Sequence, residues 1–115
     1  MILATIAGEI IMLMSHNVNV NGRRTSMRLE KETWEALDTI IKWEGTNLND
    51  LCSKIDRERK GNGLTLSVRI FVVAYFRSIA IKQDLKGNIN YAFDVVKRNG
   101  EETANLKKSA FSVQE

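Results

Sequence analysis

The side chains best suited to catalysis or metal binding are scarce in this sequence of 115 residues, which contains one cysteine, Cys52, and one histidine, His16. A single thiol cannot form an internal disulfide, and one thiol with one imidazole cannot supply the three or four ligands of a structural zinc site. A Ser-His-Asp or Cys-His arrangement would have to use His16, which lies in a polar stretch before any expected regular element. We therefore expect no enzyme, no metal site and no cofactor.

The residues that stand out instead are the hydrogen-bond donors of the segment RRTSMRLE, residues 23–30. Side chains of an extended chain alternate between two faces, so Arg24, Ser26 and Arg28 would share one face. The other face would carry Thr25, Met27 and Leu29. The whole chain has 17 Lys and Arg against 14 Asp and Glu, a net charge of +3 and a pI of about 9.2. This mild positive excess permits an anionic partner without requiring one.

A strand at residues 23–30 needs a partner, because its backbone N–H and C=O groups must find hydrogen bonds. The preceding HNVNVNG, residues 16–22, is interpreted as a short extended stretch or linker that ends in an Asn-Gly turn. No second strand of matching length follows residue 30. We therefore expect one isolated strand in each chain, paired with the same strand of another copy.

Two helices are expected to follow this strand. Residues 31–44 place apolar side chains at helical spacing with charged residues between them, at Trp34, Leu37, Ile40 and Ile41. Gly45 suits the position just past a helix end, and Asn47 suits the N-cap of a second helix over about residues 48–58. The apolar stripe of that helix comprises Leu48, Leu51, Cys52 and Ile55. On this stripe Cys52 is interpreted as a small buried apolar side chain.

A third helix is predicted to begin near Thr65 and to continue through residues 66–82. Its body is apolar almost all round, interrupted only by Arg69 and Arg77, so we expect it to be buried on most sides. Residues 83–115 are more polar, and we expect a last short helix or strand followed by a loose tail.

The composition supports a folded, largely helical chain. Hydrophobic residues make up 43% and charged residues 27%, which excludes wholesale disorder, and seven Gly with no Pro favour helices over a many-stranded sandwich. The expected fold class is mainly α with one short strand. The expected organisation is an N-terminal extension over residues 1–22, a domain over residues 23–82, and a partly ordered C-terminal extension over residues 83–115.

The first fourteen residues are strongly apolar but contain Glu9 and no basic residue before the apolar run. They match neither a secretory signal nor a membrane span of about 20 apolar residues, so we expect a cytoplasmic protein without a membrane partner. Two interpretations stay open. In the first, Met14 is the biological start and residues 1–13 are not native. In the second, the segment is native, and we expect it to add a strand or helix over the core in preference to a docking helix.

The order of strand, helix, Gly-containing turn and helix over residues 23–58 resembles the ribbon-helix-helix family of dimeric DNA-binding proteins, the class of the Arc and methionine repressors. The segments RRTSMRLEKETWEAL, EGTNLNDL and VRIFVVAYFR are similar, more narrowly, to small bacterial members that append an extra helix to this motif. The resemblance covers about residues 22–82. It implies an intertwined homodimer, in which one strand from each chain pairs antiparallel and the two enter the major groove of double-stranded DNA.

The resemblance also implies site residues and a role as a regulator of transcription, with repression and activation both left open. Arg24, Ser26 and Arg28 would contact base edges, with each arginine able to bind guanine bidentately. Backbone N–H groups at the start of the second helix, at Asn47, Leu48 and Asn49, would face a phosphate, and Arg23 and Lys31 would add phosphate contacts. The implied dimer core comprises Met27, Leu29, Trp34, Leu37, Ile41, Leu51, Ile55, Phe71 and Phe76. Further association of dimers on DNA would be possible.

Other interpretations of the same residues remain. Arg24 and Arg28 would also protect an exposed strand edge from aggregation. A protein-interaction module would use the apolar third helix and the tail, with the ribbon serving only to dimerise, and an antitoxin-like protein would fold residues 83–115 on a protein partner. Charge separates these classes, because a continuous positive surface favours DNA whereas neutralisation by Glu30 and Glu32 favours a protein partner.

Overall fold

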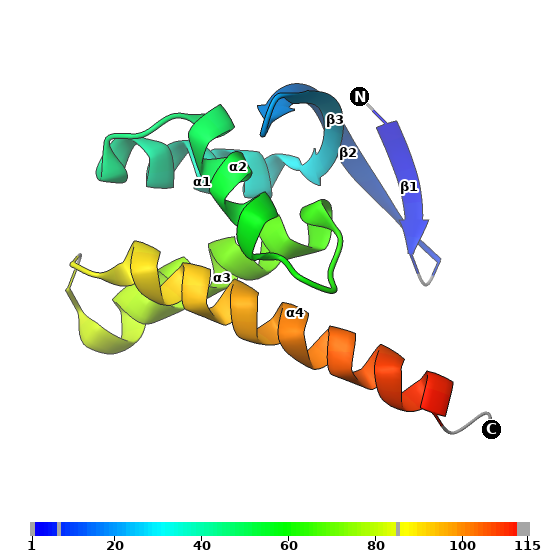
Figure 1. Ribbon diagram of the computed structural model, residues 1–115. Coiled ribbons are helices and arrows are strands. Elements are labelled where there is room, and N and C mark those ends of the chain that lie inside the picture. Colours follow the sequence, from blue (N-terminus) through cyan, green and yellow to red (C-terminus); the bar gives the residue numbers. More distant parts are fainter. Residues whose placement is uncertain (1, 7, 85, 113–115) are drawn as a thin grey trace. The chain divides into compact units, whose positions relative to one another are not determined.

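The computed structural model describes residues 2–6, 8–84 and 86–112 (Figure 1). Three strands come first, β1 (Ile2–Ile6), β2 (Glu9–Val20) and β3 (Arg23–Glu30), in one antiparallel sheet of order β1-β2-β3. Four helices follow, α1 (Lys31–Glu44), α2 (Leu48–Glu58), α3 (Leu64–Lys82) and α4 (Asn88–Ser112). The chain forms two compact units, Met1–Ser53 and Lys54–Glu115, which are described separately. The expectation of a mainly helical chain is confirmed.

The strand at residues 23–30 has the predicted bounds, but the expectation that it is isolated is wrong. β2 pairs with it from Val20↔Arg23 to Leu13↔Glu30. The connecting residues Asn21 and Gly22 have φ angles of 49° and 81°, and positive values at both positions fit the tight hairpin turns for which Asn-Gly is favoured. The strand was missed because Asn is depleted in strands, although the alternation of Asn with Val18 and Val20 has the period of two that a strand requires.

The inner face of the hairpin is apolar and buried. Val18 and Val20 on β2 and Met27 and Leu29 on β3 are each at most 1% exposed. The helices of the first unit add further buried side chains at Leu37, Ile40, Leu51 and Cys52. The alternation in β3 thus divides the strand as predicted, with one row in the core and one row outside.

Side chains of α1 and α2 attach this hairpin to the helices. The indole Nε1 of Trp34 donates a hydrogen bond of 2.8 Å to the carbonyl of Met14, and the indole meets the ring of His16 edge-on at 4.5 Å between centroids. The backbone N–H of Asn19 donates to Asn49 Oδ1 at 3.0 Å, and the backbone N–H of Asn21 donates to Ser53 Oγ at 3.0 Å. α2 therefore covers the end of β2 on the side away from β3.

In the second unit, α3 and α4 pack along one another. Phe71 and Phe93 lie 4.8 Å apart between ring centroids, and both Phe71 and Tyr75 are fully buried. The backbone N–H of Gly61 donates to the carbonyl of Gly100 at 3.1 Å, and a Cβ added to Gly61 would lie 2.7 Å from the nitrogen of Ala104. The loop before α3 approaches α4 this closely because no side chain intervenes at either glycine.

Two expectations for this unit need correction. Residues 88–112 form a single long helix, where a short element and a loose tail were predicted, because Ala92, Phe93 and Val96 give α4 an apolar row that packs on α3. α3 begins within a residue of the predicted start, but one side of it stays exposed in the single chain, at positions that include Val73 and Ile81. α3 is long and apolar enough to cross a membrane. This is weak evidence for a membrane span, because core helices of soluble proteins have the same length and composition.

Candidate nucleic-acid interface

The outer face of the β2–β3 hairpin carries two parallel rows of exposed polar side chains. The β3 row comprises Arg24, Ser26 and Arg28, all three of them exposed as the alternation predicts. Their cross-strand partners on β2 form the second row, which comprises Asn19, Asn17 and Ser15. Residues directly opposite each other in a sheet share a face, so the six side chains form one surface of hydrogen-bonding groups.

A diagonal hydrogen bond links the end of the β2 row to the centre of the β3 row. The hydroxyls of Ser15 and Ser26 lie 2.6 Å apart, and either can be the donor. This bond uses part of the hydrogen-bonding capacity of Ser26, since a hydroxyl has one hydrogen and two lone pairs. The remainder is available to a group approaching the outer face.

The backbone of β3 has a free side within the part of the chain that the structure describes. A two-residue hairpin turn is closed by the pair Val20 and Arg23, so the backbone groups of alternate residues from Arg23 point toward β2. The N–H and C=O groups of Arg24, Ser26 and Arg28 consequently point away from β2. In the sheet order β1-β2-β3 no described strand pairs on that side.

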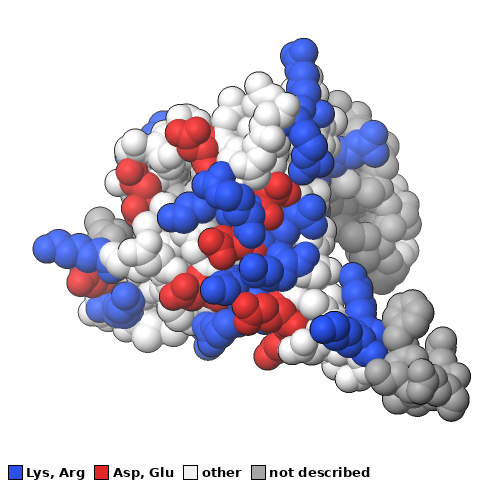
Figure 2. Space-filling view, viewed as in Figure 1, with Lys and Arg blue, Asp and Glu red and all other residues white. Residues whose placement is uncertain are grey.

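The charge around this face is unevenly compensated. Among the described residues no ion pair joins Arg24, Arg28 or Glu32 to a partner, so Glu32 makes no direct pair with either arginine. The carboxylate of Glu30 accepts a hydrogen bond from Thr33 Oγ1 at 3.3 Å. Figure 2 shows basic side chains over the hairpin at the upper right of the view, whereas basic and acidic side chains intermingle over the centre.

The other two basic residues predicted to contact phosphate, Arg23 and Lys31, lie at opposite ends of β3. Arg23 is exposed, but its cross-strand partner Val20 is buried, so Arg23 continues the inner row of β3 at its end. Lys31 begins α1 and forms an exposed ion pair with Glu35, with 3.7 Å between Nζ and Oε1. Such an exposed pair holds the ammonium only weakly.

The start of α2 is capped as predicted. Asn47 Oδ1 accepts a hydrogen bond of 2.9 Å from the backbone N–H of Asp50, which is the interaction of an N-cap residue. The side chain of Asn49 is already used by the backbone of Asn19. The N–H groups of Leu48 and Asn49 belong to the first helical turn, where donors have no partner inside the helix. Asp50 adds a negative charge to this turn and thereby weakens its attraction for an anion.

The predicted core residues fall into two groups. Met27, Leu29, Leu37, Leu51, Ile55 and Phe71 are buried within the single chain. Trp34, Ile41 and Phe76 are only half-buried. Trp34 and Ile41, with Leu37 and Leu48, line a surface cavity of about 350 Å³ in the first unit. These three half-buried side chains therefore stay partly accessible in the single chain.

Groups suited to metal binding or to nucleophilic chemistry are few among the residues that the structure describes. Among the described residues there is no group of three His, Cys, Asp or Glu side chains that would hold a metal ion. Cys52 is fully buried on α2, and burial raises the pKa of its thiol to about 12. A thiol that stays protonated is a poor nucleophile, in agreement with its interpretation as a small apolar side chain.

The row Ser15, Asn17 and Asn19 was absent from the predicted site, because residues 16–22 were interpreted as a stretch before the domain. The signal that would have revealed it is local. Asn21-Gly22 is the strongest short hairpin motif, and the residues before it alternate polar with apolar in register with β3.

One comparison with known proteins identifies this arrangement. A family model described as a ribbon-helix-helix domain matches residues 13–76, which include most of β2, all of β3, α1 and α2, and much of α3. No curated protein and no solved structure gave a significant match. Domains of this family generally bind DNA as dimers in transcription regulators and are not enzymes. Since the match covers more than half of the chain and includes its strand, helix and helix in order, the chain belongs to the ribbon-helix-helix domain family.

Proposed function

We propose that this protein is a cytoplasmic, dimeric transcriptional regulator that binds double-stranded DNA sequence-specifically. Two copies of β3 pair antiparallel along the side that faces away from β2, and the ribbon enters the major groove. The observation that carries this proposal is the coincidence of two features on β3: an outer row of Arg24, Ser26 and Arg28, and a backbone edge without a described partner.

The division of roles follows from the chemistry of each position. Arg24 and Arg28 have the planar fork of donors that fits the two acceptors of guanine, and Ser26 can donate to or accept from either class of base. The phosphate contacts in this proposal are Arg23 and Lys31, at the two ends of β3, and the first turn of α2, at Asn47, Leu48 and Asn49. Of these, the α2 turn is the weakest candidate, since Asp50 lies in the same turn.

The dimer core follows from burial. The inner rows of the two β3 strands, with Met27 and Leu29, pack over both copies of α1 and α2, and the half-buried Trp34 and Ile41 become covered. Light scattering is expected to give twice the mass of one chain. A stable, folded monomer would contradict the shared ribbon.

The test of base reading compares wild type with Arg28→Ala by fluorescence anisotropy. The DNA probes are a fragment selected from a random-sequence pool by repeated binding to wild type, and a shuffled fragment of the same composition. Each is measured at two salt concentrations. We expect binding that weakens with salt, and a loss of discrimination between the fragments of about 1–3 kcal/mol in the variant. If Arg28→Ala lowered the affinity for both fragments equally, Arg28 would not read bases and would serve only in phosphate contact or edge protection.

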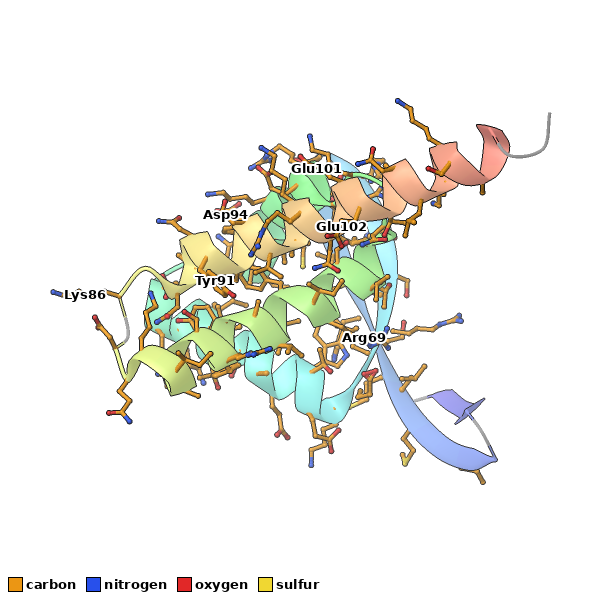
Figure 3. All side chains as sticks on the ribbon, turned by 90° about the horizontal axis from the view of Figure 1, so that it is seen from below. Arg69, Lys86, Tyr91, Asp94, Glu101 and Glu102 are labelled. Carbon is orange, nitrogen blue, oxygen red and sulfur yellow. The ribbon has the colours of Figure 1, made fainter. Side chains whose placement is uncertain are left out.

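A second candidate function, in the class of protein-interaction modules, is favoured by the exposed apolar side of the α3–α4 pair. Val73 is 65% exposed, and a groove of about 300 Å³ on this side is lined by residues of both helices, including Ile70, Tyr91 and Arg77. Figure 3 views the pair from the side on which the labelled Tyr91 and Arg69 lie. A partner segment with apolar and acidic side chains would fit this groove. A well-folded dimer that fails to bind DNA at low salt would transfer the assignment to this class.

A further inference from the structure

We infer that the outer row of β2, comprising Ser15, Asn17 and Asn19, is a second DNA-contacting element that grips the sugar–phosphate backbone on both sides of the ribbon. This inference rests on the proposed function. It assigns a positioning role to residues that lie beside the base-reading row, and Asn17, opposite Ser26, is its central member.

The hydroxyl of Ser15 is bound to Ser26, but the two asparagines of the row have no structural task that explains their residue type. The side chains of Asn17 and Asn19 are exposed and make no hydrogen bond with the described part of the chain; only the backbone of Asn19 is bound, by Asn49 and Ser53. Asparagine is depleted in strands, so two of them on one face of β2 are not there for strand stability. Both carry carboxamide donors that point to the same side as Arg24, Ser26 and Arg28.

The width of the sheet decides what these donors would meet. Pairing of two β3 strands gives a sheet with the order β1-β2-β3-β3-β2-β1, in which β1 pairs with Glu9–Leu13 and not with the row. At about 4.8 Å between strands the two β2 strands lie about 14 Å apart. The major groove is about 12 Å wide and admits a two-stranded ribbon. The pair of β3 strands therefore fills the groove, and the β2 strands lie over its two walls, where the phosphates are.

The chemistry fits phosphate contact. Asparagine and serine side chains commonly donate hydrogen bonds to phosphate oxygens, and such contacts fix the register of the protein without reading sequence. Because carboxamide and hydroxyl groups are neutral, these contacts release no counterion and leave the salt dependence of binding unchanged. This property distinguishes the β2 row from the arginines.

The experiment measures binding of Asn17→Ala and Asn17→Lys to the same selected and shuffled DNA fragments, over a range of salt concentrations. Asn17→Ala is expected to lower the affinity for both fragments equally, by roughly ten-fold, and to leave the slope of log K against log salt unchanged. Asn17→Lys places an ammonium beside each groove wall. It is therefore expected to raise the affinity for both fragments and to steepen the slope of log K against log salt by about 1.8 per dimer. Urea unfolding checks that both variants fold as wild type does.

A matched control adds the same charge elsewhere. Asn105→Lys changes an exposed asparagine of α4, and we expect it to raise the affinity and the slope less than Asn17→Lys does. Equal gains in the two lysine variants would reduce the effect to net charge and overturn the inference. A change in the ratio between selected and shuffled fragments in Asn17→Ala would make β2 a base reader and would also overturn it, as would unchanged binding in both Asn17 variants. In each of these cases wild type still binds DNA, whereas failure of the proposed function is recognised by the absence of binding by wild type itself.

Discussion

The strand β3 and the helix α3 differ in the kind of side chain that they expose. Every exposed position on the outer row of β3 is polar, while the apolar row behind it is buried. α3 buries Phe71 and Tyr75 but leaves Val73 and Ile81 at 65% and 68% exposure. The outer row of β3 is thus well solvated in the single chain, and its polar groups suit a polar partner. The outer side of α3 is a surface that a single chain leaves uncovered, and contiguous apolar surfaces of this kind mark interaction sites.

The largest effect is expected inside the second unit. Phe71→Ala removes a fully buried ring that contacts Phe93, and it should lower the free energy of unfolding by about 3–5 kcal/mol in urea denaturation. The control Val73→Ala, two residues away on the exposed side, should change it by less than about 0.5 kcal/mol. A loss of more than 1 kcal/mol in the control would show that the exposed side of α3 is covered in solution, which would break the comparison.

A comparable contrast is expected between the two rows of β3. Met27→Ala empties a position that is 1% exposed and should cost about 2–5 kcal/mol of unfolding free energy. Ser26→Ala, on the neighbouring exposed position, should cost less than about 1 kcal/mol, because it loses one exposed hydrogen bond to Ser15. Similar losses in the two variants would mean that the outer row also holds the fold together.

The thiol of Cys52 reports on the core under the hairpin. Burial raises its pKa from 9.0 to about 12, so the folded state holds the proton that the unfolded state releases. The stability linked to this thiol is fully present below pH 9 and is lost as the pH rises from there toward 12. Urea denaturation at pH 8 and pH 10.5 should show a larger loss for wild type than for Cys52→Ala, in which this linkage is absent.

A smaller effect is expected at the start of α2. Asn47→Ala removes the cap on the backbone N–H of Asp50 and should lower the unfolding free energy by about 1 kcal/mol. Asn47→Asp keeps the acceptor and should retain most of the stability. If Asn47→Ala instead left stability unchanged but weakened DNA binding, the α2 turn would be a phosphate site. The division between residues that stabilise the fold and residues that bind a partner would then include α2 as well as β3.

Much of the first unit was predictable because its local patterns agree with its tertiary structure. The period-two pattern of β3, the apolar spacing in α1, Gly45 past its end and the Asn47 cap all appear as expected, and Gly45 has a φ of 67°. β2 was not recognised because Asn17 and Asn19 oppose strand propensity, and tertiary pairing overrode that preference.

The second unit was less predictable because its decisive contacts are non-local. The polar sequence after residue 97 predicts a loose tail, but Gly100 permits a backbone approach by Gly61 that no residue with a side chain would allow. Lys107 Nζ then donates to the carbonyl of Gly61 at 3.0 Å. A helical glycine lowers helix propensity by about 1 kcal/mol relative to alanine, so its packing role cannot be inferred from propensity.

The hydrogen bonds from Asn49 and Ser53 to β2 also bear on how far the protein can polymerise. β1 occupies the outer edge of β2 at its beginning, from Glu9 to Leu13, and α2 occupies it at Asn19 and Asn21. Strand addition is thereby hindered at both ends of β2, and pairing through β3 would consume the open edge of both copies. β1 would then be the outermost described strand, and a strand of five residues is a poor template for growth. The same contacts that hold the hairpin in place would make its association self-limiting, so that it ends at two chains without extending into a fibre.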